Sequence, residues 1–232
     1  LEWTGGWRGG RAYHTCLKRA IDTYLPDELV RIRDLGFFGS AYIDVFSATF
    51  PYRCCNPRHP ATRAEAGAIQ RDIARRCRAL FGGFSSECCY DHMLAYTDYI
   101  NYVTAPMRGL RQQEARAKKA GRAWRSPVDR FVPFFELAFH DCVLSNPDKI
   151  TQEIFPGNPD YLTLVEYGGR PIYYNLAGRV RRGEIPQLKA AYDEYRARAD
   201  LMLEEMLRHE ELASGVVRVR YANGTDLYVN HT

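Results

Sequence analysis

The sequence lacks any apolar run of about eighteen residues, the length that a membrane-spanning helix needs, so it predicts no membrane segment. It also has little net charge. Lys and Arg number 32, Asp and Glu number 28, and the formal net charge is +4. A charge this small does not indicate a nucleic-acid partner. Internal repeats and low-complexity tracts are also missing. The remaining composition, 46% hydrophobic and 26% charged, is typical of a globular protein.

The chain lacks an initiating Met and a signal sequence. It begins at Leu1 in a stretch that already has the pattern of folded structure, and it ends directly after its last predicted strand. We therefore expect it to be a segment of a longer protein. On that expectation, the missing signal sequence carries no information about export.

A Cys-x-x-Cys motif is also missing, although there are seven cysteines: Cys16, Cys54, Cys55, Cys77, Cys88, Cys89 and Cys142. The odd number and the two vicinal pairs argue against a disulfide framework and favour a reducing compartment such as the cytoplasm. Several cysteines lie near His59, His92 or His140 at predicted strand ends. Because vicinal cysteines rarely ligate one ion together, we predict no metal site, and a metal-dependent hydrolase is the less favoured alternative.

The first half of the chain alternates helical and strand patterns. A helix is predicted over 24–35, with Pro26 in its first turn, and a strand over 40–46. Thr62 and Glu65 have the spacing of a capping box for a second helix. A second strand follows and ends at Glu87.

The second half is less regular. The residues after Glu87 predict a short helical stretch to about Tyr102. Because 108–125 is basic with Trp124 as its sole aromatic, we interpret it as a solvated helical insertion rather than a phosphate-binding surface. The remaining predicted elements are a buried strand within 131–140 starting near Pro133, a strand over 170–175, a helix over 184–212, and a hairpin over 216–229 turned by Asn223-Gly224.

Alternating strands and helices predict an α/β fold with a parallel sheet. A complete (β/α)₈ TIM barrel takes roughly 250 residues, and about four strands fit here. We therefore predict the later half of a (β/α) barrel over residues 1–212. Residues 213–232 are predicted to form a β-hairpin that leads into an added β element.

Asp44 and Glu87 are the most informative pair of residues, because each closes a predicted strand and one helix lies between them. Acids at neighbouring strand ends of a barrel are the arrangement that retaining glycoside hydrolysis uses. In that chemistry one carboxylate attacks the anomeric carbon and the other protonates the departing oxygen. Each acid also has an ordinary structural reading, as a loop cap or a first-turn helix residue. Asp91, four residues beyond Glu87, is an alternative partner.

The order of several short motifs resembles glycoside hydrolase families 101 and 129 and their uncharacterised relatives. The motifs are Tyr-Ile-Asp-Val (42–45), Asn-Pro-Arg-His-Pro (56–60), Ser-Glu (86–87), Val-Pro-Phe-Phe-Glu-Leu-Ala-Phe-His-Asp (132–141) and Asn-Gly-Thr-Asp-Leu-Tyr-Val-Asn (223–230). The resemblance implies a retaining α-N-acetylgalactosaminidase that acts on mucin-type O-glycans. It implies Asp44 as the nucleophile, Glu87 as the acid/base, a carbohydrate substrate and no cofactor. The rival hypothesis is a noncatalytic carbohydrate-binding or structural barrel module.

Four further residues are predicted to contact the substrate. Glu136 and His140 share one face of the strand predicted over 131–140, and Asp141 follows it. His59 lies on the loop after the first strand. Glu136 could alternatively be a buried partner of an Arg, or could raise the pKa of the catalytic acid by like-charge proximity. His59 could simply be solvated.

Overall fold

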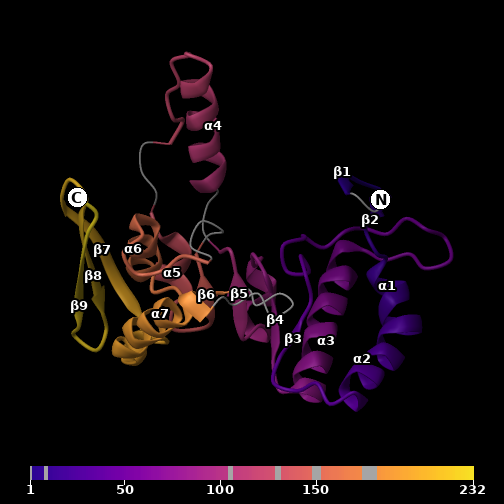
Figure 1. The fold of residues 1–232 in the computed structure, drawn as a ribbon. Coiled ribbons are helices and arrows are strands. Elements are labelled where there is room, and N and C mark those ends of the chain that lie inside the picture. Colours follow the sequence, from indigo (N-terminus) through magenta and orange to yellow (C-terminus); the bar gives the residue numbers. More distant parts are fainter. Residues whose placement is uncertain (1, 8–9, 104–106, 129–131, 148–152, 174–181) are drawn as a thin grey trace. The chain divides into compact units, whose positions relative to one another are not determined.

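The protein is described here by a computed structural model that covers residues 2–7, 10–103, 107–128, 132–147, 153–173 and 182–232 (Figure 1). It divides into two compact units. Unit 1 comprises Leu1–Ser86 and Tyr90–Thr97, and unit 2 comprises Glu87–Cys89 and Asp98–Thr232. Within these described residues, no helix has the length and apolar character needed to cross a membrane.

Unit 1 combines helices with two strand pairs. Its elements are β1 (Glu2–Trp7), β2 (Gly10–Tyr13), α1 (Leu17–Arg19), the π-helix η1 (Ala20–Tyr24), α2 (Leu25–Asp34), β3 (Ala41–Tyr42), α3 (Arg63–Phe81), β4 (Phe84–Glu87, whose last residue belongs to unit 2) and the 3₁₀-helix η2 (Asp91–Tyr96). Strands β1 and β2 pair antiparallel. The helix predicted over 24–35 is confirmed by α2, although helical structure already begins at Leu17.

The capping box predicted for α3 is confirmed. The Thr62 hydroxyl accepts a hydrogen bond from the Glu65 backbone N–H at 3.2 Å, and the Glu65 carboxylate accepts one from the Thr62 N–H at 2.7 Å. The helix ends before Gly82, whose φ of 102° is a left-handed conformation that favours glycine. Ile73 and Cys77, four residues apart on one face of α3, are buried.

The strand predicted over 40–46 is much shorter in the structure, because β3 covers Ala41–Tyr42 alone. It pairs in parallel with β4, in the register Ala41 to Phe84 and Tyr42 to Ser85. Beyond it the chain turns, and Val45 takes a positive φ of 58°. Side chains extend the pairing, since the Ser86 hydroxyl donates to the Ile43 carbonyl at 2.7 Å and accepts from the Ser47 N–H at 3.0 Å.

Unit 2 contains a second parallel pair, several helices and an antiparallel sheet. Its elements are β5 (Tyr99–Asn101), α4 (Met107–Lys119), α5 (Phe134–Phe139), β6 (Leu144–Asn146), α6 (Pro159–Glu166), η5 (Arg182–Glu184), α7 (Ile185–Ala197), η6 (Ala199–Leu201), β7 (Met206–Ala213), β8 (Val216–Tyr221) and β9 (Asp226–Asn230). Strands β5 and β6 pair in parallel, with Asn101 opposite Asn146. Parallel strand pairs with helices agree with the predicted α/β class, whereas the half-barrel stays a prediction.

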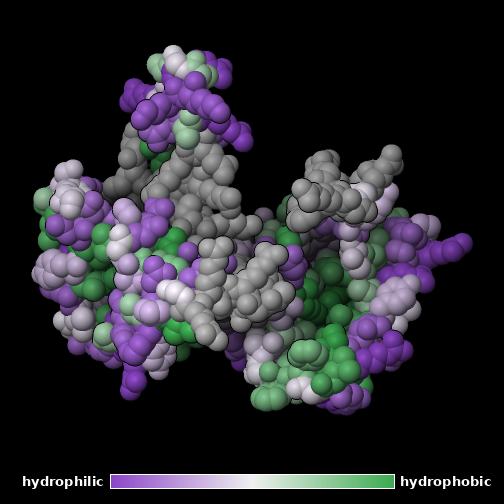
Figure 2. Space-filling model, viewed as in Figure 1, coloured by the Kyte–Doolittle hydropathy of each residue, from purple (hydrophilic) through white to green (hydrophobic). Residues whose placement is uncertain are grey.

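Helix α4 corresponds to the basic segment predicted as a solvated helix. Its last turn carries Arg116, Lys118 and Lys119. Figure 2 shows mostly hydrophilic residues over this helix, in agreement with that prediction. It ends earlier than expected, at Lys119.

The strand predicted within 131–140 is wrong, because the described part of this segment forms helix α5. A short apolar run does not distinguish a strand from a helix by its pattern. In the structure Phe134 is 76% exposed, while Glu136 and His140 are buried four residues apart on one helical face. The strand pattern would have placed Phe134 and Glu136 on the same face.

Three other expectations need correction. The helical stretch predicted up to Tyr102 contains β5, and the helix predicted over 184–212 ends at Ala197. Residues 206–212 belong instead to β7, because pairing with β8 satisfies the hydrogen bonds of their backbone N–H and C=O groups. Of the strand predicted over 170–175, residues 174 and 175 lie outside the described residues. Residues 170–173 form no strand, and the Ile172 carbonyl accepts a hydrogen bond from the Glu153 N–H at 2.8 Å.

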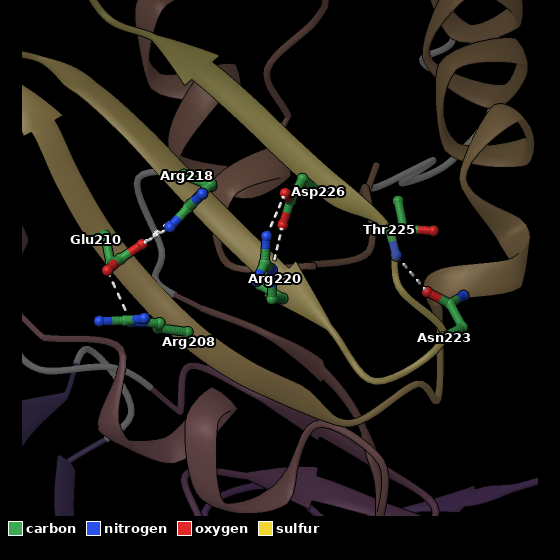
Figure 3. Close-up of polar contacts among 7 residues, drawn as sticks. All are labelled: Arg208, Glu210, Arg218, Arg220, Asn223, Thr225 and Asp226. Atoms are coloured by element: carbon green, nitrogen blue, oxygen red, sulfur yellow. Dashed lines mark hydrogen bonds and ion pairs between the residues drawn. The ribbon is translucent and has the colours of Figure 1, made fainter.

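The predicted C-terminal hairpin is confirmed and is part of a three-stranded sheet in the order β7-β8-β9. Strand β8 alternates strictly: Val217, Val219 and Tyr221 are buried in an apolar cluster with Met206 and Leu201. The arginines between them face outward and pair with acids on the neighbouring strands (Figure 3). Arg220 binds Asp226 through two hydrogen bonds of 2.8 Å, and Arg218 pairs with Glu210. This alternation fixes the register of the sheet.

Candidate active site at the strand ends

Polar residues lie at or just beyond the ends of three strands, and each is followed by a residue in a left-handed backbone conformation. Asp44 precedes Val45 at φ 58°, Glu87 precedes Cys88 at φ 35°, and Asn101 precedes Tyr102 at φ 62°. A positive φ costs a non-glycine residue roughly 1–2 kcal/mol, and it is most unusual for a β-branched valine. Such strain gathers at functional sites, where it directs a side chain that regular structure would aim elsewhere.

Asp44 lies in unit 1, in the turn directly after β3, and is exposed. The Tyr42 hydroxyl donates to its Oδ1 atom at 3.3 Å. A carboxylate with one long hydrogen bond and access to solvent retains lone pairs for another group. The sequence predicts Asp44 at the end of a strand, and the structure places it in the turn two residues beyond β3.

Glu87 is the last residue of β4, is partly buried and lies in unit 2. The acids stand in equivalent positions in the strand pair: Asp44 is two residues beyond Tyr42, and Glu87 is two residues beyond Ser85, its registered partner. The predicted parallel pairing of the two strands is confirmed, with Asp44 in the turn beyond β3 and Glu87 at the end of β4. Their catalytic roles stay predictions.

Two asparagines, which the sequence reasoning missed, accompany Glu87 in unit 2. The Cys88 N–H donates to the Asn101 carbonyl at 2.7 Å, and Asn146 lies opposite Asn101 in the β5–β6 register. The Tyr99 hydroxyl holds the Asn101 Oδ1 atom at 2.6 Å, and the Asn146 amide donates to the Arg170 carbonyl at 2.9 Å. The available signal was a short run ending in a polar residue, Tyr-Ile-Asn and Leu-Ser-Asn, as at Asp44.

Asp91, the alternative partner, begins η2. Its Oδ1 atom accepts a hydrogen bond from the His92 backbone N–H at 2.8 Å. This contact satisfies one of the N–H groups that a helix start leaves unpaired. The geometry favours the structural reading of Asp91.

Glu136 and His140 share a face, as predicted, but on helix α5 and inside the protein. They are 1% and 3% exposed, respectively. His140 Nδ1 forms a 2.8 Å hydrogen bond with the Glu204 carbonyl, and its ring lies edge-on to Tyr221. Asp141 is exposed and accepts a hydrogen bond from the Cys142 thiol at 3.3 Å. Of these three predicted substrate contacts, Asp141 alone is open to solvent.

His59 lies in unit 1 beside two cysteines. Its Nδ1 atom is 3.2 Å from Cys16 Sγ and 3.5 Å from Cys54 Sγ. The three residues line a cavity of about 460 Å³ that also includes His14, Tyr52 and Asn56. The sequence predicts His59 as a substrate contact and gives no sign of its proximity to Cys16, which lies 43 residues before it.

No family model and no curated protein matches the sequence. Solved structures do match: α-N-acetylgalactosaminidase NagBb from Bifidobacterium bifidum, as a quadruple mutant, has a TM-score of 0.70 and 24% identity over 97% of this chain. Its ligand-free form has a TM-score of 0.69 at 23% identity, and its GalNAc complex 0.68 at 24%. The fold of this chain is therefore similar to that of part of NagBb. It spans about a third of NagBb, since the matches cover 34% or 35% of that chain.

The close approach of Gly168 to His140 gives a stability prediction. Gly168 has a φ of 63°, and a Cβ atom placed there lies 2.1 Å from His140 Nε2. The hydrogen bond to Glu204 holds the imidazole in place. We expect Gly168→Ala to lower the free energy of unfolding by about 3 kcal/mol, which combines the backbone cost with overpacking.

Gly121 is the matched control, because its φ is 61° and no heavy atom lies within 4 Å of a Cβ built there. Gly121→Ala carries the same backbone cost without the steric contact, so we expect a loss of about 1 kcal/mol. Urea denaturation of both variants measures the difference. Equal losses would show that the packing of His140 against Gly168 contributes nothing.

His140 also predicts a pH dependence of stability. Burial lowers the pKa of its imidazole below the ordinary value of 6.5, and the nearby Arg198 charge lowers it further, against the hydrogen bond with the Glu204 carbonyl. Between the two pKa values the unfolded chain therefore binds a proton that the folded chain does not. Protonation of His140 therefore does not reduce the free energy of unfolding above pH 6.5, and it reduces that free energy progressively as the pH drops below 6.5.

Urea midpoints at about pH 7.5 and pH 5.5 measure this effect. We expect the midpoint of the wild type to fall at the lower pH, and that of His140→Gln to fall less. An identical pH response in the two proteins would contradict the assignment.

Proposed function

We propose that this chain carries the two catalytic carboxylates of a retaining glycoside hydrolase acting on α-linked N-acetylgalactosaminyl or related glycans. The observation that carries the proposal is the equivalent register of Asp44, just beyond the end of β3, and Glu87, the last residue of the parallel strand β4. Support comes from the likeness in fold to an enzyme that is named an α-N-acetylgalactosaminidase and was solved with GalNAc.

In the proposed mechanism, Asp44 attacks the anomeric carbon as the glycosidic bond breaks, and Glu87 transfers its proton to the departing oxygen. Glu87 then removes a proton from water, and the water oxygen displaces Asp44 from the glycosyl-enzyme. Two inversions at one carbon give net retention. The chemistry needs carboxyl groups roughly 5–5.5 Å apart and no cofactor.

The strained backbone after each acid suits these roles. The left-handed Val45 and Cys88 turn the chain immediately after Asp44 and Glu87, so the position of each acid is set by the fold. A carboxylate held before the substrate arrives needs no reorganisation during the reaction. We propose that the Asn101 and Asn146 amides lie beside Glu87 and help to hold its carboxylate in position.

We assign the other predicted residues by their exposure. Asp141 is open to solvent and can accept hydrogen bonds from sugar hydroxyls. Glu136 and His140 are enclosed, and we propose that they support the neighbouring backbone instead of contacting the sugar.

The stereochemistry of hydrolysis tests the function. The protein that contains this chain is given an aryl α-N-acetylgalactosaminide, and proton NMR follows the first sugar formed. We expect the α-anomer before mutarotation. The β-anomer would contradict a nucleophilic Asp44, and sugar binding without turnover would identify a noncatalytic carbohydrate-binding module.

A further inference from the structure

Three donor atoms of types that ligate metals converge in unit 1. Cys16 Sγ and Cys54 Sγ are 3.7 Å apart, and both are near His59 Nδ1, at 3.2 and 3.5 Å. All three side chains are partly buried. Among the described residues, they form the one group of three or more such side chains whose donor atoms lie within 4.8 Å of one another.

The distances fit tetrahedral zinc. With Zn–S bonds of about 2.3 Å and a Zn–N bond of about 2.0 Å, tetrahedral angles place two sulfur ligands about 3.8 Å apart and sulfur and nitrogen about 3.5 Å apart. The two contacts made by Cys54 agree with these values to about 0.1 Å, and Cys16 to His59 is shorter. Two thiolates with one imidazole are a soft donor set that favours zinc over magnesium or calcium.

The local backbone places these donors before any ion binds. Cys54 and Ala61 bond reciprocally, N–H to carbonyl, at 2.8 and 3.0 Å, and so close the loop between them. Inside the loop the Asn56 carbonyl accepts from the His59 N–H at 3.1 Å, and the Asn56 side chain accepts from the Arg58 N–H at 2.9 Å. Cys54 and His59 are therefore held by one closed turn, and Cys16 approaches from the start of α1.

We propose that Cys16, Cys54 and His59 bind a Zn²⁺ ion. Its fourth position faces the cavity of about 460 Å³ that these residues line, and water or a small ligand fills it. Binding releases the two thiol protons, so the Zn²⁺ ion and the two thiolates have zero net charge. The ion links Cys16, at the start of α1, to Cys54 and His59 in the loop that follows Asp44. The assignment revises the expectation that the chain holds no metal, and it does not depend on the proposed glycosidase activity.

Metal analysis tests the proposal on the protein without an affinity tag, reduced and dialysed after incubation with zinc. We expect one zinc ion per chain. Replacing a residue that only orients a metal ligand typically lowers metal affinity about 10–100-fold. Replacing a ligand itself should therefore lower the affinity for zinc by more than about 100-fold. That loss is expected for Cys16→Ser, Cys54→Ser and His59→Asn. Cys55→Ser is the matched control, because Cys55 is exposed, lines the same cavity and stands outside the cluster.

Cobalt substitution in the wild type gives a test that does not depend on the folding of any variant. We expect thiolate-to-cobalt charge transfer, tetrahedral d–d bands and release of two protons per ion. Three outcomes would overturn the proposal: no stoichiometric metal in the wild type, equal loss of metal in Cys55→Ser, or a Cys16–Cys54 disulfide found by peptide mapping in the freshly isolated protein.

Discussion

Replacing Asp44 with Asn is expected to lower turnover of an aryl α-N-acetylgalactosaminide by more than about 10³-fold and to leave sugar binding nearly unchanged. The amide keeps the shape of the side chain but is too weak a nucleophile to form the glycosyl-enzyme. The measurement is kcat in the protein that contains this chain, with the dissociation constant for GalNAc measured by calorimetry. A noncatalytic binding module would show no turnover in any form, and the same change would weaken its affinity.

Asp91→Asn is the control, because Asp91 is an exposed acid at the first position of η2, where its Oδ1 atom accepts a hydrogen bond from the His92 N–H. The same chemical change at a helix start affects stability by about 1 kcal/mol and leaves kcat within a few-fold of the wild type. Normal turnover in Asp44→Asn would rule out Asp44 as the nucleophile. Loss of turnover in Asp91→Asn instead would transfer the catalytic role to the alternative acid.

The second large effect concerns Glu87. We expect Glu87→Ala to lose about 10²–10⁴-fold in kcat on substrates with poor leaving groups, because general acid–base catalysis contributes that much. Substrates with good leaving groups need little protonation, so their first step is affected less. Water then attacks the intermediate without a base, and the glycosyl-enzyme accumulates.

Azide distinguishes this role from a structural one. A small anion needs no general base, so azide should restore turnover of Glu87→Ala and give the α-glycosyl azide, with retained configuration. Glu87→Gln keeps the size of the side chain and serves as the check on folding. A Glu87→Ala protein that loses activity but gains nothing from azide would contradict the acid/base assignment.

The elements that were predictable from the sequence are those whose signals are local. The Thr62–Glu65 capping box and the Asn223-Gly224 turn each use hydrogen bonds or dihedral angles within a few residues, and both are in the structure. The polar strand ends at Asp44 and Glu87 followed from runs that end in an acid. The predicted strand places Glu136 and His140 on a common face, and they do share a face, but on helix α5. The prediction and the structure agree because residues four positions apart share a face on both a strand and a helix.

Tertiary pairing decided what local pattern left open. Residues 206–212 continue a helical pattern, yet they form β7 because β8 offers a row of backbone partners and an apolar face at Val219 and Tyr221. Likewise, no spacing rule joins Cys16 to Cys54 and His59, since chain folding alone brings residues 38 or more positions apart within a few ångströms. The sequence by itself determined the caps, turns and acid-tipped strands, because their energies are local. Only the tertiary structure decided which distant metal-ligand side chains come together. Those contacts form between segments that are far apart in the sequence, and no local pattern in one segment indicates the position of the other.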